Sequence, residues 1–198
     1  MKDNIQSFGY SEMYEWQCVP HGTPRFGRFV QFDEHYPNMI KLYTGADYIL
    51  GVTSANSTID SDNPEEWHDK FYANEYGDLY LRKEKLAVGE KKYDQIKEIS
   101  YIETRPWTHY IPIENSDFDS KKEYIKRSMR SEWVRVNLLG KCIVEDNGKC
   151  VPGQYCKPFA SKFKDEAGIA VPSEDENDKH RYYILSRISK NTIMIVNK

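Results

Sequence analysis

The chain has 198 residues, of which 39% are hydrophobic and 30% charged, as in an ordinary globular protein. This length suits one domain, or one domain with an elaborated loop, and we predict a single domain over residues 1–198. The net charge of −3 gives no electrostatic reason to bind a phosphate backbone, so no nucleic-acid partner is expected. No run approaches the roughly 18 apolar residues of a membrane-spanning helix, so no membrane partner is expected either.

The first residues and the cysteines indicate the compartment. Met1 to Gln6 is polar and lacks the apolar segment of a secretory signal, so we expect synthesis in the cytoplasm. The cysteines lack the paired C-x2-C arrangement of zinc sites, and we predict no metal site and reduced thiols. They are Cys18, Cys142, Cys150 and Cys156.

Three strands are predicted in the first quarter of the chain. Residues 27–32 alternate polar and apolar, residues 39–43 are short and apolar, and residues 48–53 are nearly continuous and β-branched. A polar loop follows. Asn63 is then a candidate N-cap, and Pro and two acids come directly after it, so we predict a short helix over residues 64–74.

The middle third of the chain gives weaker signals. Residues 78–85 alternate again, but about 88–120 is charged, interrupted by Gly and rich in Pro, Asn and Asp among aromatics. We predict a loop-rich excursion there.

The last third is predicted to consist of hairpins. Residues 133–145 give the strongest strand pattern and end at Asp146-Asn147-Gly148, a turn sequence whose Asn and Gly tolerate positive φ. The chain should return along residues 149–151, and residues 181–196 read as a C-terminal hairpin. Short strands separated by turns predict a mainly β fold, a compact barrel or sandwich with long loops and one short helix.

Common enzyme motifs are absent from the sequence. There is no phosphate-binding G-x-x-x-x-G-K-[ST] loop, because Gly140-Lys141 is followed by Cys142 within a strand pattern. There is no G-x-S-x-G elbow, and the histidines lack triad or H-E-x-x-H spacing. These histidines are His21, His35, His68, His109 and His180.

Two carboxylates near the N-terminus are candidates for acid–base chemistry. The stretch from Ser11 to Trp16 places Glu12 and Glu15 three residues apart among apolar and aromatic residues. Amide hydrolysis at neutral pH needs an acid or base whose pKa is moved toward the working pH, and apolar neighbours raise the pKa of a carboxylate by desolvation. Glu12 is therefore a chemical candidate, although a Glu in a strand with a satisfied hydrogen bond would give the same pattern.

Short motifs from end to end of the chain share the order and spacing of one protein family. They are Gly9–Trp16, Gly27–Val30, Asp47–Asn56, Glu65–Lys70, Glu123–Ile125, Arg127–Ser128, Glu132–Trp133, Leu138–Lys141, Asp146–Cys150, Tyr155–Pro158, Gly168–Ala170 and Asn191–Ile193. By these motifs the chain resembles the glutamic-peptidase-type, self-cleaving intramolecular chaperone domain (the Peptidase G-two family). That domain stands at the C-terminus of phage pre-neck-appendage and tail-spike proteins.

The resemblance implies a function in assembly. In that family the domain follows a long trimeric β-structured shaft, helps three chains to register, and is released by cutting its own upstream peptide bond. It implies a homotrimer and the upstream shaft of the same protein as partners, with residues 1–10 as the junction. It also implies a location in the virion, or in the host cytoplasm during phage assembly. No cofactor is expected, although some relatives suggest an effect of ATP on release.

The candidate cleavage site departs from the family pattern. The family cuts before the aspartate of an Asp-Tyr-Ala-Glu stretch, with that Asp and the following Glu as the catalytic pair, whereas this chain reads Gly9-Tyr10-Ser11-Glu12. The expected bond is Phe8–Gly9. Losing one member of a catalytic pair lowers rates by orders of magnitude, so weak or absent cleavage is expected. The one enzymatic activity implied is a glutamic-type autoproteolysis that acts once on its own chain.

The short segment before Gly9 leaves two origins open: an excised C-terminal piece, or the product of a split gene. A second function also stays open, that of a tip module of a phage tail fibre that binds glycan on the host surface. Aromatic residues make up 14% of the chain, and Tyr101, Trp107 and Tyr110 are the candidates for stacking on sugars. Packing in the core or in a trimer interface would explain the same aromatics.

Overall fold

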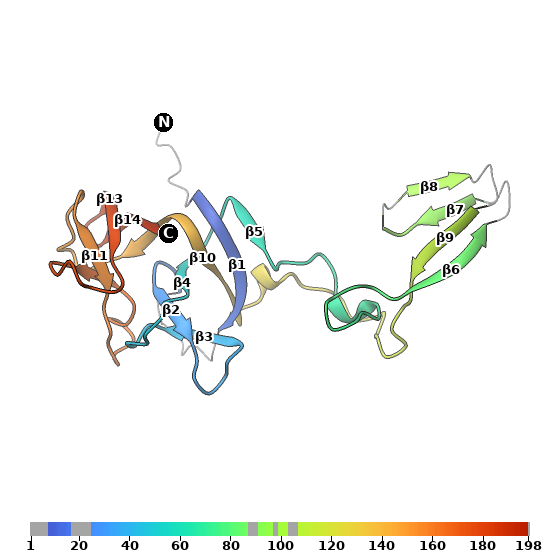
Figure 1. Ribbon diagram of the computed structural model, residues 1–198, viewed down its shortest axis with the longest axis horizontal. Coiled ribbons are helices and arrows are strands. Elements are labelled where there is room, and N and C mark those ends of the chain that lie inside the picture. The colour runs from blue at the N-terminus through green and yellow to red at the C-terminus, as the bar shows by residue number, and fades with distance from the viewer. Residues whose placement is uncertain (1–7, 17–24, 87–90, 97–98, 103–106, 198) are drawn as a thin grey trace. The chain divides into compact units, whose positions relative to one another are not determined.

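The structure is a computed structural model that describes residues 8–16, 25–86, 91–96, 99–102 and 107–197. The chain forms two compact units: unit 1 is Met1–Pro64 with Ile125–Lys198, and unit 2 is Glu65–Tyr124. Figure 1 labels all the strands except β12. The strands of unit 1 are β1 (Phe8–Trp16), β2 (Phe29–Phe32), β3 (Met39–Leu42), β4 (Gly51–Ser54), β5 (Ile59–Ser61), β10 (Trp133–Glu145), β11 (Tyr155–Pro158), β12 (Ala170–Pro172), β13 (Tyr182–Ser189) and β14 (Thr192–Asn197).

A closed barrel forms the centre of unit 1. Its ring runs β1, β10, β4, β2, β3, and the parallel pairing of Glu15 with Met39 closes it from β1 to β3. Closure leaves these strands without a free sheet edge over the paired stretches. One cluster of buried side chains fills the barrel: Trp16, Val30, Ile40, Val134 and Val136.

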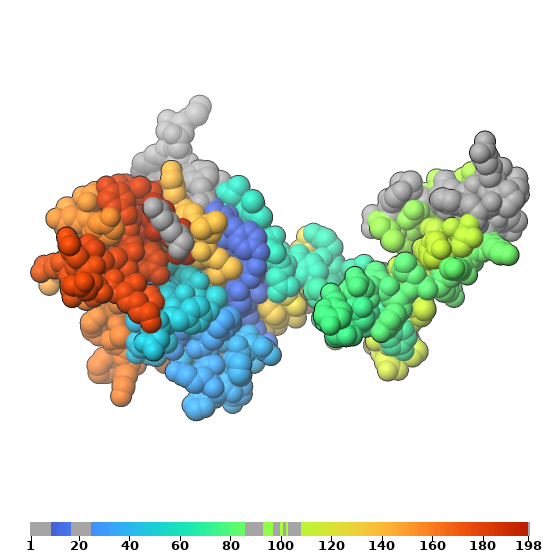
Figure 2. Space-filling model, viewed as in Figure 1, coloured from blue at the N-terminus to red at the C-terminus, as the bar shows by residue number. Residues whose placement is uncertain are grey.

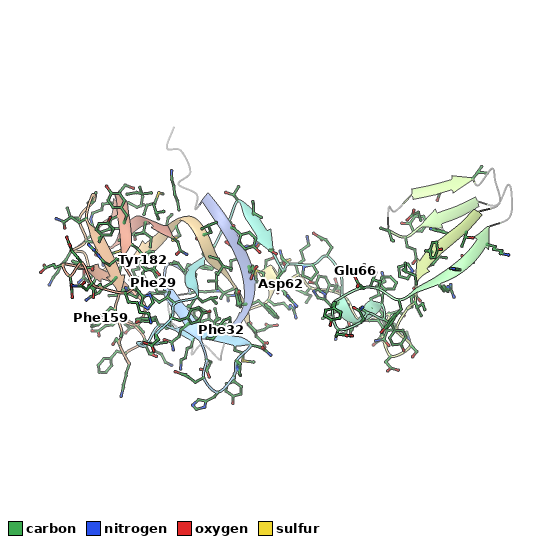
Figure 3. All side chains as sticks on the ribbon, viewed as in Figure 1. Phe29, Phe32, Asp62, Glu66, Phe159 and Tyr182 are labelled. Carbon is green, nitrogen blue, oxygen red and sulfur yellow. The ribbon has the colours of Figure 1, made fainter. Side chains whose placement is uncertain are left out.

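A second sheet grows from the long strand β10. Residues 140–145 of β10 pair with β14, and β13, β11 and β12 follow in order. Side chains of β14 alternate between buried and half-buried, which gives the sheet one core-facing side. Within this second core the rings of Phe29 and Tyr182 lie 4.8 Å apart, and Figure 3 shows them together. Figure 2 shows these C-terminal segments against β2 and β4, consistent with Phe29 N donating to Gly168 O at 2.8 Å.

Asp146 anchors the turn after β10 to β13. Its two carboxylate oxygens accept hydrogen bonds from the Arg187 guanidinium at 3.1 and 2.9 Å, and one of them also accepts from the Cys150 N–H at 3.1 Å. Burial raises the pKa of Asp146, but the bonds from Arg187 and Cys150 more than offset burial, so its pKa lies below the ordinary value.

Unit 2 contains two antiparallel strand pairs. One joins β6 (Leu81–Leu86) to β9 (Trp107–Pro112), and the other joins β7 (Lys91–Asp94) to β8 (Ile99–Ile102). Pro112 is the one buried side chain that the structure describes in this unit. Both clusters of buried hydrophobic residues belong to unit 1.

The sequence predicted the class and the strongest strands correctly. The fold is mainly β, and its short helical segments are 3-10 turns, η1 (His68–Lys70) and η2 (Arg127–Met129). The strand predicted for residues 133–145 has those bounds in β10, and the C-terminal hairpin is β13 with β14. Strands predicted at 27–32, 39–43 and 48–53 are confirmed as the shorter β2, β3 and β4.

The helix predicted for residues 64–74 is wrong. Only the single turn η1 forms, and Trp67 before it is already extended at φ −63° and ψ 131°. Tyr72 N donates to Ile113 O at 3.0 Å, and Phe71 bridges to Glu114, so the segment pairs across unit 2. The apolar stripe behind the N-cap signal is short, with Trp67 and Phe71 four residues apart, and strand-like pairing prevailed.

Two further predictions need correction. The excursion predicted over about 88–120 contains β7, β8 and β9, so ordered hairpins replace much of the expected loop. The chain after the turn at Gly148 does not return along β10, because β14 occupies that edge. Cys150 is buried in the second core instead, and the turn is held by Asp146.

Candidate functional site

Strand β1 carries the residues proposed from the sequence. It pairs antiparallel with β10 from Phe8 opposite Lys141 to Glu15 opposite Trp133. Phe8 is described as the first residue of the strand, and residues 1–7 of the predicted junction lie outside the described part of the chain. The scissile candidate Phe8–Gly9 is thus the first peptide bond of a barrel strand.

The Glu12 carboxylate is held by two phenols of its own strand. The hydroxyl of Tyr10 donates to Oε1, and the hydroxyl of Tyr14 donates to Oε2 at 2.8 Å. Residues two apart in a strand share a face, which explains why these side chains meet. Burial and then the bond to Glu12 raise the pKa of Tyr14, so its hydroxyl stays a donor. Both oxygens of Glu12 are engaged, and each keeps a further acceptor site.

Glu15 does not form a carboxylate pair with Glu12. The two residues are three positions apart in β1, so their side chains point to opposite faces of the strand. Both border one groove of about 470 Å³ at the edge of β1, between the stretches paired with β5 and β3. The groove is lined by residues 12–15, Phe32, Pro37, Asn38, Asp62 and Trp133.

Glu12 lies too far along the strand to reach the candidate bond of its own chain. Gly9 and Glu12 are three positions apart in the extended strand β1, so their Cα atoms are about 10 Å from each other. Tyr10 stands between them on the face of Glu12 and holds its carboxylate. In this conformation the Glu12 carboxylate is therefore directed away from the Phe8–Gly9 bond of its own chain.

Gly9 allows a close approach of β1 and β10. A Cβ at this position would lie 2.2 Å from the carbonyl oxygen of Leu139 and 2.5 Å from Nδ2 of Asn137. The register also shifts here, because Tyr10 pairs with Leu139 while Ser11 pairs with Asn137, so Leu138 forms a bulge. Any side chain at position 9, including the Asp of the family pattern, would force the two strands apart.

Sequence reasoning missed two buried polar residues beside this bulge. Ser11 and Asn137 are both 0% exposed, and among the described residues neither the Ser11 hydroxyl nor either polar atom of the Asn137 side chain has a hydrogen-bond partner. The available signal was the apolar doublet Leu138-Leu139, which interrupts the polar–apolar alternation directly after Asn137.

The described cysteines are buried thiols of the second core. Cys142, Cys150 and Cys156 are free, and burial raises the pKa of Cys142 to about 12; Cys18 lies outside the described residues. Across the described ranges, no group of three or more His, Cys, Asp or Glu side chains is arranged to hold a metal ion. Over the same ranges, no helix has the length and apolar character of a membrane span.

The aromatic candidates for glycan binding belong to unit 2. Tyr110 is exposed, with Nζ of Lys83 5.7 Å from its ring centroid. The side chains of Tyr101 and Trp107 lie outside the described part of the structure.

Comparisons with known proteins agree with this fold. A family model, Peptidase_G2, IMC autoproteolytic cleavage domain, matches residues 3–190. The structure of pre-mature gene product 12 of bacteriophage phi29 matches with a TM-score of 0.65 and 19% identity, over 100% of this chain and 23% of that chain. The C-terminal fragment of the same gene product matches with a TM-score of 0.60 and 21% identity, over 96% of this chain and 99% of the fragment.

At these identities the two structures establish a shared fold, and this chain spans less than a quarter of the pre-mature phage protein. A search of curated proteins found no match. The family model covers nearly the whole chain, including β1 and β10. The chain therefore belongs to the family of the Peptidase_G2, IMC autoproteolytic cleavage domain.

Proposed function

We propose that this chain is an intramolecular chaperone of a phage appendage or tail-spike protein. Three copies associate, align the shaft that precedes them, and are then separated from it by a slow cut at Phe8–Gly9. The family and the phage structures that share the fold support this assignment. The observation that carries it is the state of unit 2, which has strands but no cluster of buried hydrophobic side chains among its described residues.

Apolar side chains of unit 2 are exposed in a single copy. Tyr76 is 83% exposed, Ile96 71% and Ile102 63%, and they are joined by Tyr72, Leu79, Tyr80, Leu81, Tyr93 and Tyr110. Two-stranded sheets are at best marginally stable alone, and large exposed apolar areas mark contact surfaces. Unit 2 therefore needs a partner that covers it.

Other copies of the same chain are the partner that fits an assembly chaperone. Three equivalent hairpins around an axis bury the same side chains on each copy and close the assembly. Holding three chain ends together raises their effective concentration, which offsets the entropic cost and slowness of registering an intertwined β shaft. An appendage shaft places the chain in or on the virion during assembly.

Cleavage is proposed to occur between copies. Because Glu12 lies about 10 Å along β1 from its own Gly9, the Glu12 of one copy acts on the junction of its neighbour. Its carboxylate takes a proton from water, the water oxygen adds to the carbonyl carbon of Phe8, and the proton passes to the Gly9 nitrogen as the C–N bond breaks. Gly9 in place of the family's Asp makes this step slow.

Light scattering of the purified chain tests the assembly. At micromolar concentration we expect a particle of three times the 23.3 kDa chain mass. Replacing Tyr80 and Leu81 with Ser should shift it to monomer, whereas Phe159→Ser, an exposed aromatic of unit 1, should leave the trimer intact. A stable monomer of the parent chain overturns the proposal.

A native shaft fused before Met1 tests the cleavage. Intact mass should show a cut between Phe8 and Gly9 that Glu12→Gln removes and Glu34→Gln, an exposed carboxylate elsewhere in unit 1, does not. Adding the unfused parent chain to the fused Glu12→Gln chain before assembly should restore cutting in mixed trimers. Failure of this rescue, while the parent fusion cuts, shows that Glu12 acts within its own chain.

Glycan binding is the second candidate, favoured by the exposed tyrosines of unit 2. A glycan array with the trimer, in which binding is lost on Tyr76→Ala while the trimer persists, would establish it. Loss of the trimer in the same variant assigns Tyr76 to assembly.

A further inference from the structure

The bulge at Leu138 turns Asn137 into the protein. On β10 the side chains of Val134, Val136, Cys142 and Val144 are buried in regular alternation, and Asn137 is buried in addition to them. An extra residue in one strand re-aims neighbouring side chains, and such bulges are frequent next to active sites. Here the re-aimed side chain is an amide placed against the start of β1.

The Asn137 amide stands beside the candidate bond. Its Nδ2 is the atom that a Cβ on Gly9 would meet at 2.5 Å, so it lies against the Gly9 Cα, one bond from the nitrogen of the Phe8–Gly9 peptide. Both residues are anchored through their backbones. The Asn137 carbonyl accepts from Nδ2 of Asn197 at 3.0 Å, and the Gly9 carbonyl accepts from the Ser57 hydroxyl at 2.8 Å.

An amide without partners is costly in this position. Buried polar groups in folded proteins are nearly always hydrogen-bonded, and each exception calls for an explanation. Within the part of the chain that the structure describes, both polar atoms of the Asn137 side chain lack a partner, and so does the hydroxyl of Ser11, the residue opposite it. A donor kept free and fixed in a water-excluded place is what stabilises a charge that develops only in a transition state.

We propose that the side-chain amide of Asn137 is the oxyanion donor for cleavage of the Phe8–Gly9 bond of its own chain, which rests on the self-cleavage proposed above. As water adds to the Phe8 carbonyl carbon, the electron pair of the C=O bond moves to oxygen, and Nδ2–H of Asn137 donates to that oxygen. When the C–N bond breaks, the pair returns to re-form the carbonyl of a free Phe8 carboxyl group, and the proton released from water leaves on the Gly9 amine. Glu12 of the neighbouring copy is the base, so the site is complete only in the assembly.

This arrangement gives Gly9 a role of its own. Because position 9 has no side chain, Nδ2 of Asn137 can lie close to the peptide. A Cβ built on Gly9 would be only 2.5 Å from this nitrogen. The space that the family's Asp would need is taken in this chain by Leu139 O and Asn137. A hydrogen-bond donor on β10 thus acts beside the Phe8–Gly9 bond, where the family's Asp is replaced by Gly9.

The test measures the cleavage rate of the shaft fusion in its trimeric fraction. Asn137→Ala removes the donor and should slow cutting about 100-fold. Asn137→Asp keeps the shape but puts an acceptor and a negative charge beside the oxyanion, and should slow cutting at least as much. The control is Gln31→Ala, which removes another buried amide of the barrel whose oxygen accepts from Thr44 N at 2.8 Å.

A thermal melt separates a catalytic from a structural role. Asn137→Ala should lower the melting temperature less than Gln31→Ala, because the atoms removed from Asn137 have no partner among the described residues, whereas Gln31→Ala removes an existing hydrogen bond from the Thr44 N–H. Slow cutting with a retained melt supports the donor role.

The remaining outcomes overturn the proposal in distinguishable ways. Parent-like cutting by Asn137→Ala removes Asn137 from the reaction and leaves the proposed function standing. Parent-like cutting by Asn137→Asp alone shows that the side chain accepts and does not donate. Loss of the trimer in both variants makes Asn137 a structural residue. A parent fusion that is trimeric and uncut refutes self-cleavage itself, and the oxyanion role with it.

Discussion

Unit 1 and unit 2 are made of the same kind of strand but differ in what the strands enclose. The ten strands of unit 1 surround two clusters of buried side chains, whereas the described side chains of unit 2 form no such cluster and include the exposed Tyr93, Ile102 and Tyr110. Unit 1 also exposes apolar side chains, among them Met129 and Phe163, but its two buried clusters can stabilise a single copy. We therefore expect unit 1 to provide most of the folding stability and unit 2 to provide the surface that contacts other copies.

Removing unit 2 should have the largest effect, because it should abolish self-association and leave unit 1 folded. Asn63 Nδ2 lies 3.3 Å from Ser128 Oγ, so the ends of unit 1 are close enough for a short Gly-Ser linker to replace residues 65–124. We expect a folded barrel by circular dichroism that is monomeric in light scattering. A trimer that survives the deletion would move the contact surface to unit 1.

An ion pair of unit 1 should matter far more than one of unit 2. Asp146→Ala leaves Arg187 without its carboxylate and should lower the free energy of unfolding by about 3 kcal/mol, the low end for a buried pair because Arg187 is partly exposed. Lys70→Ala, which breaks an exposed pair with Glu66, should cost less than about 1 kcal/mol. Urea unfolding curves measure both, and equal losses would contradict the contrast.

The same carboxylate sets an acid limit for unit 1. The pKa of Asp146 is lowered in the folded state, so its stabilising effect is present above the unfolded value of about 3.9 and is lost as pH falls below it. Urea midpoints between pH 6 and pH 3 should fall more steeply for the parent than for Asp146→Asn. If the urea midpoints of the two proteins fell in parallel with pH, Asp146 would not contribute to the acid destabilisation.

Gly9→Ala should sharpen the comparison inside unit 1. The added Cβ meets the Leu139 carbonyl, a backbone atom that cannot rotate away, so we expect a loss of about 1–3 kcal/mol in urea unfolding. Gly77→Ala is the matched control in unit 2, where a Cβ meets nothing within 4 Å, although its φ of +85° adds a strain of its own. A neutral Gly9→Ala would mean that β1 and β10 separate easily.

The smallest expected effect is that of Tyr14→Phe. It removes one hydrogen bond to Glu12 and should cost about 0.5–1.5 kcal/mol. Because the pKa of Tyr14 is raised in the folded state, its contribution is complete below the ordinary tyrosine value of about 10 and is lost as pH rises above it. Absorbance near 295 nm should show one late-titrating tyrosine fewer in the variant.

Local patterns predicted much of the fold. The alternation in residues 133–145 predicted β10 to the residue, whereas the catalytic role expected for Glu12 stays a prediction. Side chains alternate between the two faces of a strand. Once β1 is recognised as a strand, this alternation puts Tyr10, Glu12 and Tyr14 on one face and Glu15 on the other.

Long-range pairing set what local patterns did not predict. Gly9 and Asn137 meet because β1 pairs with β10 around a one-residue bulge, and no property of either segment alone specifies that register. The helix expected at residues 64–74 failed for the same reason, since Tyr72 finds its partner at Ile113.

The first pair of β1, Phe8 with Lys141, is the last rung of its ladder with β10. A cut after Phe8 would remove only that pair, while Gly9–Trp16 would stay paired in the barrel. The released domain would thus keep its folded barrel, and the shaft would retain only the residues up to Phe8.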